Sequence, residues 1–108
     1  MIDEARMEKA VHYLVETDVE CAKAKAVFEE LSDLRKTVIA FEYETAREKG
    51  SQGDAEHIAR KSQDYISHLT KIKNAQIAFE TLRNRRNTAC VVIDVWRSQN
   101  SSKNKGVI

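Results

Sequence analysis

The chain has 108 residues, enough for one domain at most, and 42% of them are hydrophobic and 32% charged. Its 18 basic and 17 acidic side chains leave a formal net charge of +1, so the overall charge does not indicate a nucleic-acid-binding protein. With only two cysteines, Cys21 and Cys90, a disulfide framework and a four-thiolate zinc site are excluded.

The first segment predicts one long α-helix over residues 3–49, because it contains no proline and no glycine before Gly50. Asp3 can cap its start, and Arg47 suits its negative end. Gly50-Ser51-Gln52-Gly53 matches the Gly-x-x-Gly loop that holds RNA in KH domains. That fold also needs strands, which this sequence does not predict, so we interpret residues 50–53 as a turn between helices.

The second segment predicts a helix over residues 54–97, with Asp54 as its N-terminal cap. The two helices and their turn form a hairpin domain of residues 1–98. Residues 99–108 are rich in Ser, Asn and Lys, which is typical of a flexible basic tail.

Apolar residues recur in steps of three and four along both helices, which predicts an all-α, coiled-coil-like antiparallel hairpin. The seam is expected to include Met7, Val11, Leu14, Cys21, Phe28, Leu34 or Arg35, Phe41, Ile58, Leu69 and Cys90. If the turn is centred at its midpoint, facing residues have numbers that add to about 103. Asp18 then lies opposite Arg85 or Arg86, and we predict a partly buried Asp18–Arg86 ion pair that fixes the register.

A second set of apolar residues lies off this seam and would remain in water in a single hairpin. A dimer of hairpins that forms a four-helix bundle would cover them. The predicted oligomer interface contains Val15, Val19, Val27, Ile39, Ile66, Ile77, Val91, Val92 and Val95. The alternative is a compact three- or four-helix monomer, in which the second helix breaks within 84–88, its weakest helical stretch.

The charge is uneven along the chain, because residues 83–108 carry six basic and one acidic side chain. One interpretation is a site for nucleic-acid phosphates and bases, made of Arg83, Arg85, Arg86, Trp96, Arg97, Lys103 and Lys105. In the other, this basic end packs against the acidic start of the first helix, which carries Glu8, Glu16, Asp18 and Glu20.

The sequence contains no recognisable catalytic motif, and we predict no enzyme activity, no cofactor and no metal. Helical di-iron sites need Glu and Glu-x-x-His motifs on several helices, and only Asp54-x-x-His57 comes near. His12 and His68 fall at other heights of the hairpin, so we interpret all three histidines as surface residues.

The opening EARMEKAVHYLVETD and the closing VIDVWRSQN with its short basic tail resemble small, all-helical accessory proteins of tailed phages and prophages. The resemblance covers most of the length and assigns no functional residue. It implies a protein of the host-cell interior that acts by binding, in the setting of DNA recombination or of countering host functions.

Two functions therefore remain open. The first is an oligomeric helical module that binds itself and a phage recombination factor or host protein, and the second is a DNA-associated accessory protein that uses the basic end. No run of about 18 apolar residues is present, so we expect no membrane partner and a cytoplasmic location.

Overall fold

The computed structural model contains three α-helices and describes the backbone of residues 1–107 and the side chains of residues 1–102. Helix α1 spans Glu4–Arg47, α2 spans Gln52–Lys61 and α3 spans Gln63–Val107. Acidic residues stand in the first turn of each helix, where they complement the positive helix end. The predicted all-α class is confirmed.

The chain divides into two compact units, each built from part of α1 and part of α3. Unit 1 comprises Met1–Lys23 with Glu80–Ile108, and unit 2 comprises Ala24–Phe79 and includes α2. In unit 1, the Ile2 backbone N–H donates to the Gln99 side chain, and the Arg86 side chain donates to the Leu14 carbonyl. Residue numbers rise on α1 as they fall on α3, so the two segments are antiparallel.

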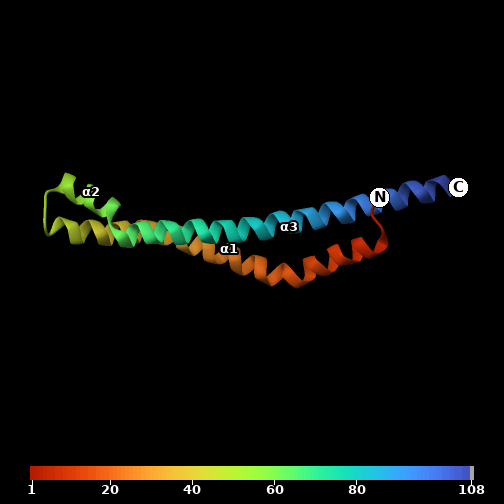
Figure 1. The fold of residues 1–108 in the computed structure, drawn as a ribbon, viewed down its shortest axis with the longest axis horizontal. Helices are drawn as coiled ribbons and strands as arrows, with labels where there is room; N and C mark the ends of the chain where they lie inside the picture. The colour runs from red at the N-terminus through yellow and green to blue at the C-terminus, as the bar shows by residue number, and fades with distance from the viewer. Residues whose placement is uncertain (108) are drawn as a thin grey trace. The chain divides into compact units, whose positions relative to one another are not determined.

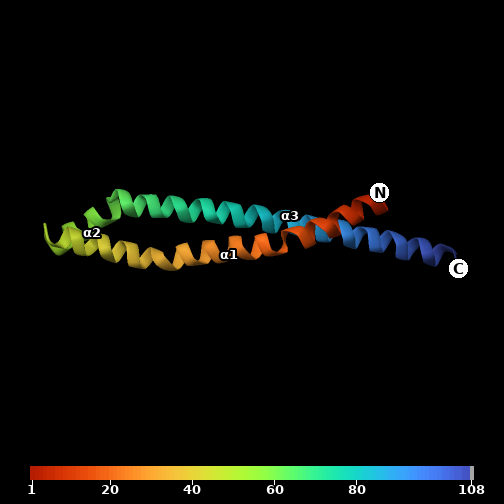
Figure 2. The ribbon, with the colours of Figure 1, turned by 90° about the horizontal axis from the view of Figure 1, so that it is seen from below.

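Unit 2 has the same antiparallel pairing. The Phe28 and Phe79 rings stack with centroids 6.2 Å apart, and His68 Nε2 lies 2.7 Å from the Leu31 carbonyl oxygen, to which it donates. The two views of the ribbon show α1 and α3 running side by side in this unit (Figures 1 and 2). The predicted helical hairpin is therefore confirmed.

The turn between α1 and α2 is held by Ser51 rather than by Asp54, the predicted cap. Ser51 has an extended backbone, and its Oγ accepts a hydrogen bond from the Asp54 N–H at 3.3 Å. The same hydroxyl donates to the Asp54 carboxylate at 2.9 Å. Asp54 thus stands inside the first turn of α2, and the helix begins about two residues earlier than predicted.

The second helical segment breaks at Ser62, not within 84–88. Ser62 has φ −62° and ψ 144°, so one extended residue separates α2 from α3. Its N–H donates to the Ala59 carbonyl, and its Oγ accepts from the Tyr65 N–H at 3.2 Å. Ser62 therefore ends α2 and caps α3. It gives a hydrogen-bond partner to a carbonyl at the end of α2 and to an N–H at the start of α3, groups that helix ends otherwise leave unpaired.

Helix α3 is continuous through residues 84–88 and extends to Val107, beyond the end predicted near residue 98. Residues 99–107 are thus helical instead of forming the flexible tail that their composition suggested. The compact three- or four-helix monomer with a break at 84–88 is excluded as well. Serine and asparagine lower helix propensity by only a few tenths of a kcal/mol each, which a long helix tolerates.

The buried residues are mostly small. In unit 1, Ala10, Ala89 and Val92 form a cluster on which Ile2, Tyr13, Leu14 and Ile93 pack. In unit 2, α2 lies beside the end of α1, and Ala55 and Ala59 are almost completely buried (Figures 1 and 2). Among the described residues no large side chain is fully buried, so the helices approach closely through alanine.

Gly53→Ala is expected to raise the free energy of unfolding by about 0.4–1 kcal/mol, because Gly53 is inside α2 and has no positive φ. A Cβ added there would meet no atom within 4 Å. Urea denaturation followed by circular dichroism measures the change. Gly50→Ala is the control: its Cβ would lie at an ordinary 3.7 Å from the Asp54 Cβ. A loss of stability in Gly53→Ala would contradict this prediction and show that the first turn of α2 needs glycine at this position.

Candidate functional site

Arg86 joins α3 to α1 in unit 1. Its Nη1 donates to the Leu14 carbonyl at 2.7 Å and to Thr17 Oγ1 at 2.8 Å, while Nη2 lies 3.3 Å from an Asp18 oxygen. The predicted Asp18–Arg86 pair is thus present, but its burial is one-sided, since the Arg86 side chain is 21% exposed and that of Asp18 77%. Of the three contacts of Arg86, the ion pair is the one that faces solvent, and the other two acceptors, the Leu14 carbonyl and the Thr17 hydroxyl, are neutral. We call these three contacts the Arg86 clamp.

This clamp removes Arg86 from the predicted nucleic-acid site, because its guanidinium is committed to α1. Arg83 forms a 3.3 Å ion pair with Glu80 on its own helix. Arg85 and Arg97 are exposed, and Trp96 is half-buried. The side chains of Lys103 and Lys105 lie outside the described residues. Of the described members of the predicted site, only Arg86 is therefore committed to the other helix.

Most residues of the predicted oligomer interface are exposed, and Val15 and Val19 are among the most exposed, at 71% and 63%. Ile39 is half-buried. The assignment of Val92 to this interface is wrong, because Val92 belongs to the buried cluster of unit 1. The remaining members are exposed: Val27, Ile66, Ile77, Val91 and Val95.

The predicted seam is also partly wrong, because several large apolar residues assigned to it are exposed and add to the apolar surface in contact with water. Small or polar residues take the inner positions, including Ala10, Thr17, His68 and Ala89, so neighbouring large residues turn outward. Cys90 is exposed and not packed, and both cysteines are free thiols. The large seam residues that are exposed instead are Val11, Leu34, Phe41, Ile58 and Leu69.

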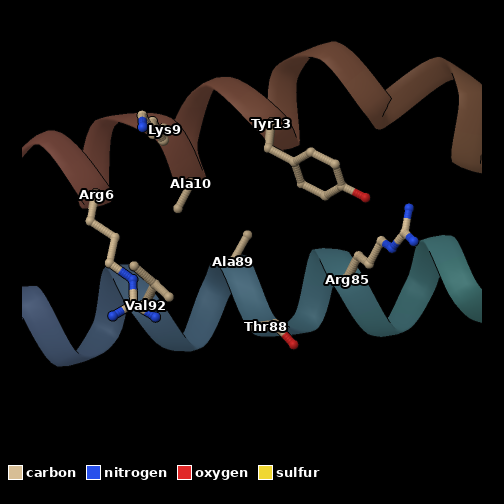
Figure 3. Close-up of a pocket in the computed structure, with 8 residues that line it drawn as sticks. All are labelled: Arg6, Lys9, Ala10, Tyr13, Arg85, Thr88, Ala89 and Val92. Atoms are coloured by element: carbon tan, nitrogen blue, oxygen red, sulfur yellow. The ribbon is translucent and has the colours of Figure 1, made fainter. Parts of the chain in front are cut away.

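A shallow groove of about 370 Å³ runs between α1 and α3 within unit 1 (Figure 3). Ala10, Ala89 and Val92 form its apolar floor. Its other lining residues are Arg6, Lys9 and Tyr13 on α1 and Arg85 and Thr88 on α3. An apolar floor with three cationic side chains around it suits a ligand that is apolar and carries negative charge.

Tyr13 has a polar atom that lacks a partner. Figure 3 shows its ring extending from α1 toward α3, with the hydroxyl on the side of Arg85. That hydroxyl is buried and has no hydrogen-bond partner among the described residues. An unsatisfied buried hydroxyl costs about 1–3 kcal/mol, so such a group calls for a specific explanation.

A second hollow, of about 550 Å³, lies in unit 2 beside α1 and is lined by Ser32, Arg35, Lys36, Ile39, Arg60 and Tyr65. Its polar groups are mostly satisfied within the unit. Arg35 Nε donates to Tyr65 Oη at 3.3 Å, and Arg60 pairs with Glu56 at 2.9 Å. We therefore regard the groove of unit 1 as the stronger candidate site.

The histidines have three different environments. His12 lies 2.9 Å from Glu16 on the surface, His57 is exposed, and His68 is buried, contrary to its predicted surface position. Within the described residues, no group of three or more His, Cys, Asp and Glu side chains could hold a metal ion. Nor does any helix there combine the length and apolar character needed to cross a membrane.

Sequence reasoning did not single out Arg6, Lys9 and Tyr13. The available signal was their spacing, because steps of three and four place these residues on one side of a helix. The acidic residues interspersed along α1 hid that signal in the charge count. The spacing of Arg6, Lys9 and Tyr13 indicates a site only because Arg85 and Thr88 of α3 line the same groove.

Comparison with known proteins provides no relative from which a function could be transferred. No protein-family model, no curated protein and no solved structure matches this chain. A functional assignment therefore has to be made from the surfaces described above.

Proposed function

We propose that the chain is a non-enzymatic, homo-oligomeric helical module that binds other proteins through its exposed apolar faces. The observation that carries this proposal is the periodic exposure of large apolar residues. Val11, Val15 and Val19 recur every four residues, which places them on one side of α1. Val91 and Val95 repeat the same spacing on α3.

Energetics favour covering these faces. Burying apolar surface contributes about 25 cal/mol per Å², and contiguous apolar patches on a monomer commonly mark interaction sites. The core of each unit contains mainly alanine, which contributes little area. A second copy that packs on these faces would supply the missing burial, with a four-helix bundle as the simplest closed arrangement.

The setting is part of the same proposal. The resemblance at the two ends of the chain suggests a phage-type accessory protein of the host cytoplasm, whose further partner is a phage recombination factor or a host protein. Capture of partners with the tagged chain, from nuclease-treated and untreated cells, separates protein partners from those that depend on DNA.

Val15→Asp combined with Val19→Asp is expected to convert the oligomer into a monomer, because two carboxylates would have to be buried in the interface. Light scattering after size-exclusion chromatography over a concentration series measures this. The dissociation constant should rise at least about 100-fold, equivalent to about 2.7 kcal/mol.

The matched control is Lys61→Gln with Lys71→Gln, which changes the net charge by the same amount at exposed positions outside the valine faces. This control should keep the oligomeric state of the original chain. A chain that is monomeric at every concentration would contradict the proposal.

The second candidate is a DNA-associated accessory protein, favoured by the exposed Arg85 and Arg97, of which Arg97 follows the half-buried Trp96 in the sequence. It has less support, because Arg83 and Arg86 are engaged within the chain. Phosphate contacts would make affinity fall steeply with salt, so titration of single- and double-stranded DNA across a salt series tests it. Absence of binding at about 50 mM salt would reject this candidate.

A further inference from the structure

The groove of unit 1 carries positive charge that the chain itself does not neutralise. In the part of the chain whose side chains are described, those of Arg6, Lys9 and Arg85 make no hydrogen bond or ion pair. The groove thus offers several donors for an anionic acceptor, next to an apolar floor.

The shape of the groove suits a helix. It is open along its length and lies between two antiparallel helices, with Ala10 and Ala89 at its floor. Side chains this small allow a third helix to approach closely. Its α1 residues, from Arg6 to Tyr13, span two helical turns, or about 10 Å, so the occupant would present about two turns.

A helix surface of matching chemistry exists in unit 2 of this chain. Val27, Leu34 and Phe41 recur every seven residues on α1 and are all exposed, Phe41 at 66%. Glu30 and Glu44 are exposed between and beyond them at the intervening three-residue steps. We call this surface, residues 27–44, the acidic ridge.

The acidic ridge combines the two properties that the groove requires. Seven-residue spacing keeps its apolar residues on one side of the helix, and Glu30 lies on the same side, between Val27 and Leu34. The Glu30 side chain makes no hydrogen bond or ion pair within the described part of the chain. Nucleic acid fits the groove less well, because the floor of Ala10, Ala89 and Val92 is aliphatic and Tyr13 is the single aromatic residue in the lining.

We propose that the groove of unit 1 binds the acidic ridge of a second copy of this chain. Val27 and Leu34 of the second copy lie on the alanine floor, and the Glu30 carboxylate pairs with Arg6 and Lys9. This inference rests on the proposed homo-oligomeric function and assigns one further pair of surfaces, in addition to the exposed valine faces, that contributes to the association.

Charge exchange tests the pairing. Arg6→Glu with Lys9→Glu reverses the groove, and Glu30→Lys reverses the ridge. Each variant alone is expected to raise the dissociation constant of the oligomer at least about tenfold, and the combined variant to return it to within about threefold of the original value. Analytical ultracentrifugation over a concentration series measures all four proteins, with Glu20→Lys as an exposed control on the same helix that should leave the constant unchanged.

Tyr13→Phe tests whether the buried hydroxyl takes part in docking. Its removal should leave the folded monomer as stable or more stable and should leave association unchanged, because the hydroxyl is buried within unit 1. Circular dichroism at low concentration checks the fold of every variant. Weaker association of Tyr13→Phe would show that the groove rearranges on binding, which would contradict docking on the groove as it stands.

The other outcomes distinguish this inference from the proposed function. If the chain oligomerises and Arg6→Glu with Lys9→Glu does not weaken it, the groove is not the interface, although the proposed function stands. If the combined variant fails to recover, the ridge is not the occupant. If the charge-reversed groove loses oligonucleotide binding without any change in oligomerisation, a nucleic-acid ligand replaces the second copy. A chain that is monomeric throughout overturns both proposals.

Discussion

Arg86→Ala is expected to lower the free energy of unfolding by about 2–4 kcal/mol. Arg86 donates to the Leu14 carbonyl and to Thr17 Oγ1, and hydrogen bonds from a charged donor contribute about 1.5–3 kcal/mol. Thr17 is itself buried, so removal of the guanidinium leaves its hydroxyl with only the bond that it donates to Tyr13. Urea denaturation monitored by circular dichroism measures the loss.

Two companion variants identify which contact matters. Asp18→Asn should cost less than about 1 kcal/mol, because the Asp18 side chain is largely in water and exposed ion pairs contribute little. Arg86→Lys keeps the charge but lacks the planar fork, with which Nη1 donates to both neutral acceptors while Nη2 faces Asp18, so its stability should fall between that of Arg86→Ala and that of the original chain. If Asp18→Asn proved as damaging as Arg86→Ala, the ion pair and not the two neutral contacts of the Arg86 clamp would hold the helices together.

Ala55→Leu is expected to cost about 1–3 kcal/mol, because Ala55 has 0% exposure and a larger side chain has no space. The added atoms would push α2 away from the elements that bury it, and the turn capped by Ser51 would have to follow. The melting temperature measured by circular dichroism should fall by several degrees. Ala26→Leu makes the same chemical change at an exposed position of α1 and should alter stability by less than about 0.5 kcal/mol. Equal effects at both sites would show that α2 is not tightly packed.

The helices, their antiparallel pairing and the Asp18–Arg86 contact were predictable because each depends on a local or periodic signal. The absence of proline predicts long helices, and the position of the turn determines which residues face each other within each unit. The use of small residues, mainly alanine, at the inner positions of the hairpin was not predictable in the same way. Alanine is a good helix former on either face, and Ala26 and Ala40 are exposed although Ala10 and Ala89 are buried.

The break at Ser62 escaped prediction for a related reason. Serine costs only a few tenths of a kcal/mol inside a helix, yet it is also one of the best N-terminal caps, so its position alone does not decide between the two. Its hydrogen bond to the Tyr65 N–H and the burial of Ala55 and Ala59 settle the choice in the folded chain. The candidate groove was missed since it combines residues from two helices far apart in sequence.

Two of the hydrogen bonds between α3 and α1 have a backbone carbonyl of α1 as their acceptor. In unit 1, Arg86 donates to the carbonyl of Leu14, and in unit 2, His68 donates to the carbonyl of Leu31. A backbone carbonyl is present whatever residue occupies the position, so these two bonds do not depend on which side chain stands at positions 14 and 31. A substitution at Leu14 or Leu31 thus keeps the acceptor, whereas a substitution at Arg86 or His68 removes the donor.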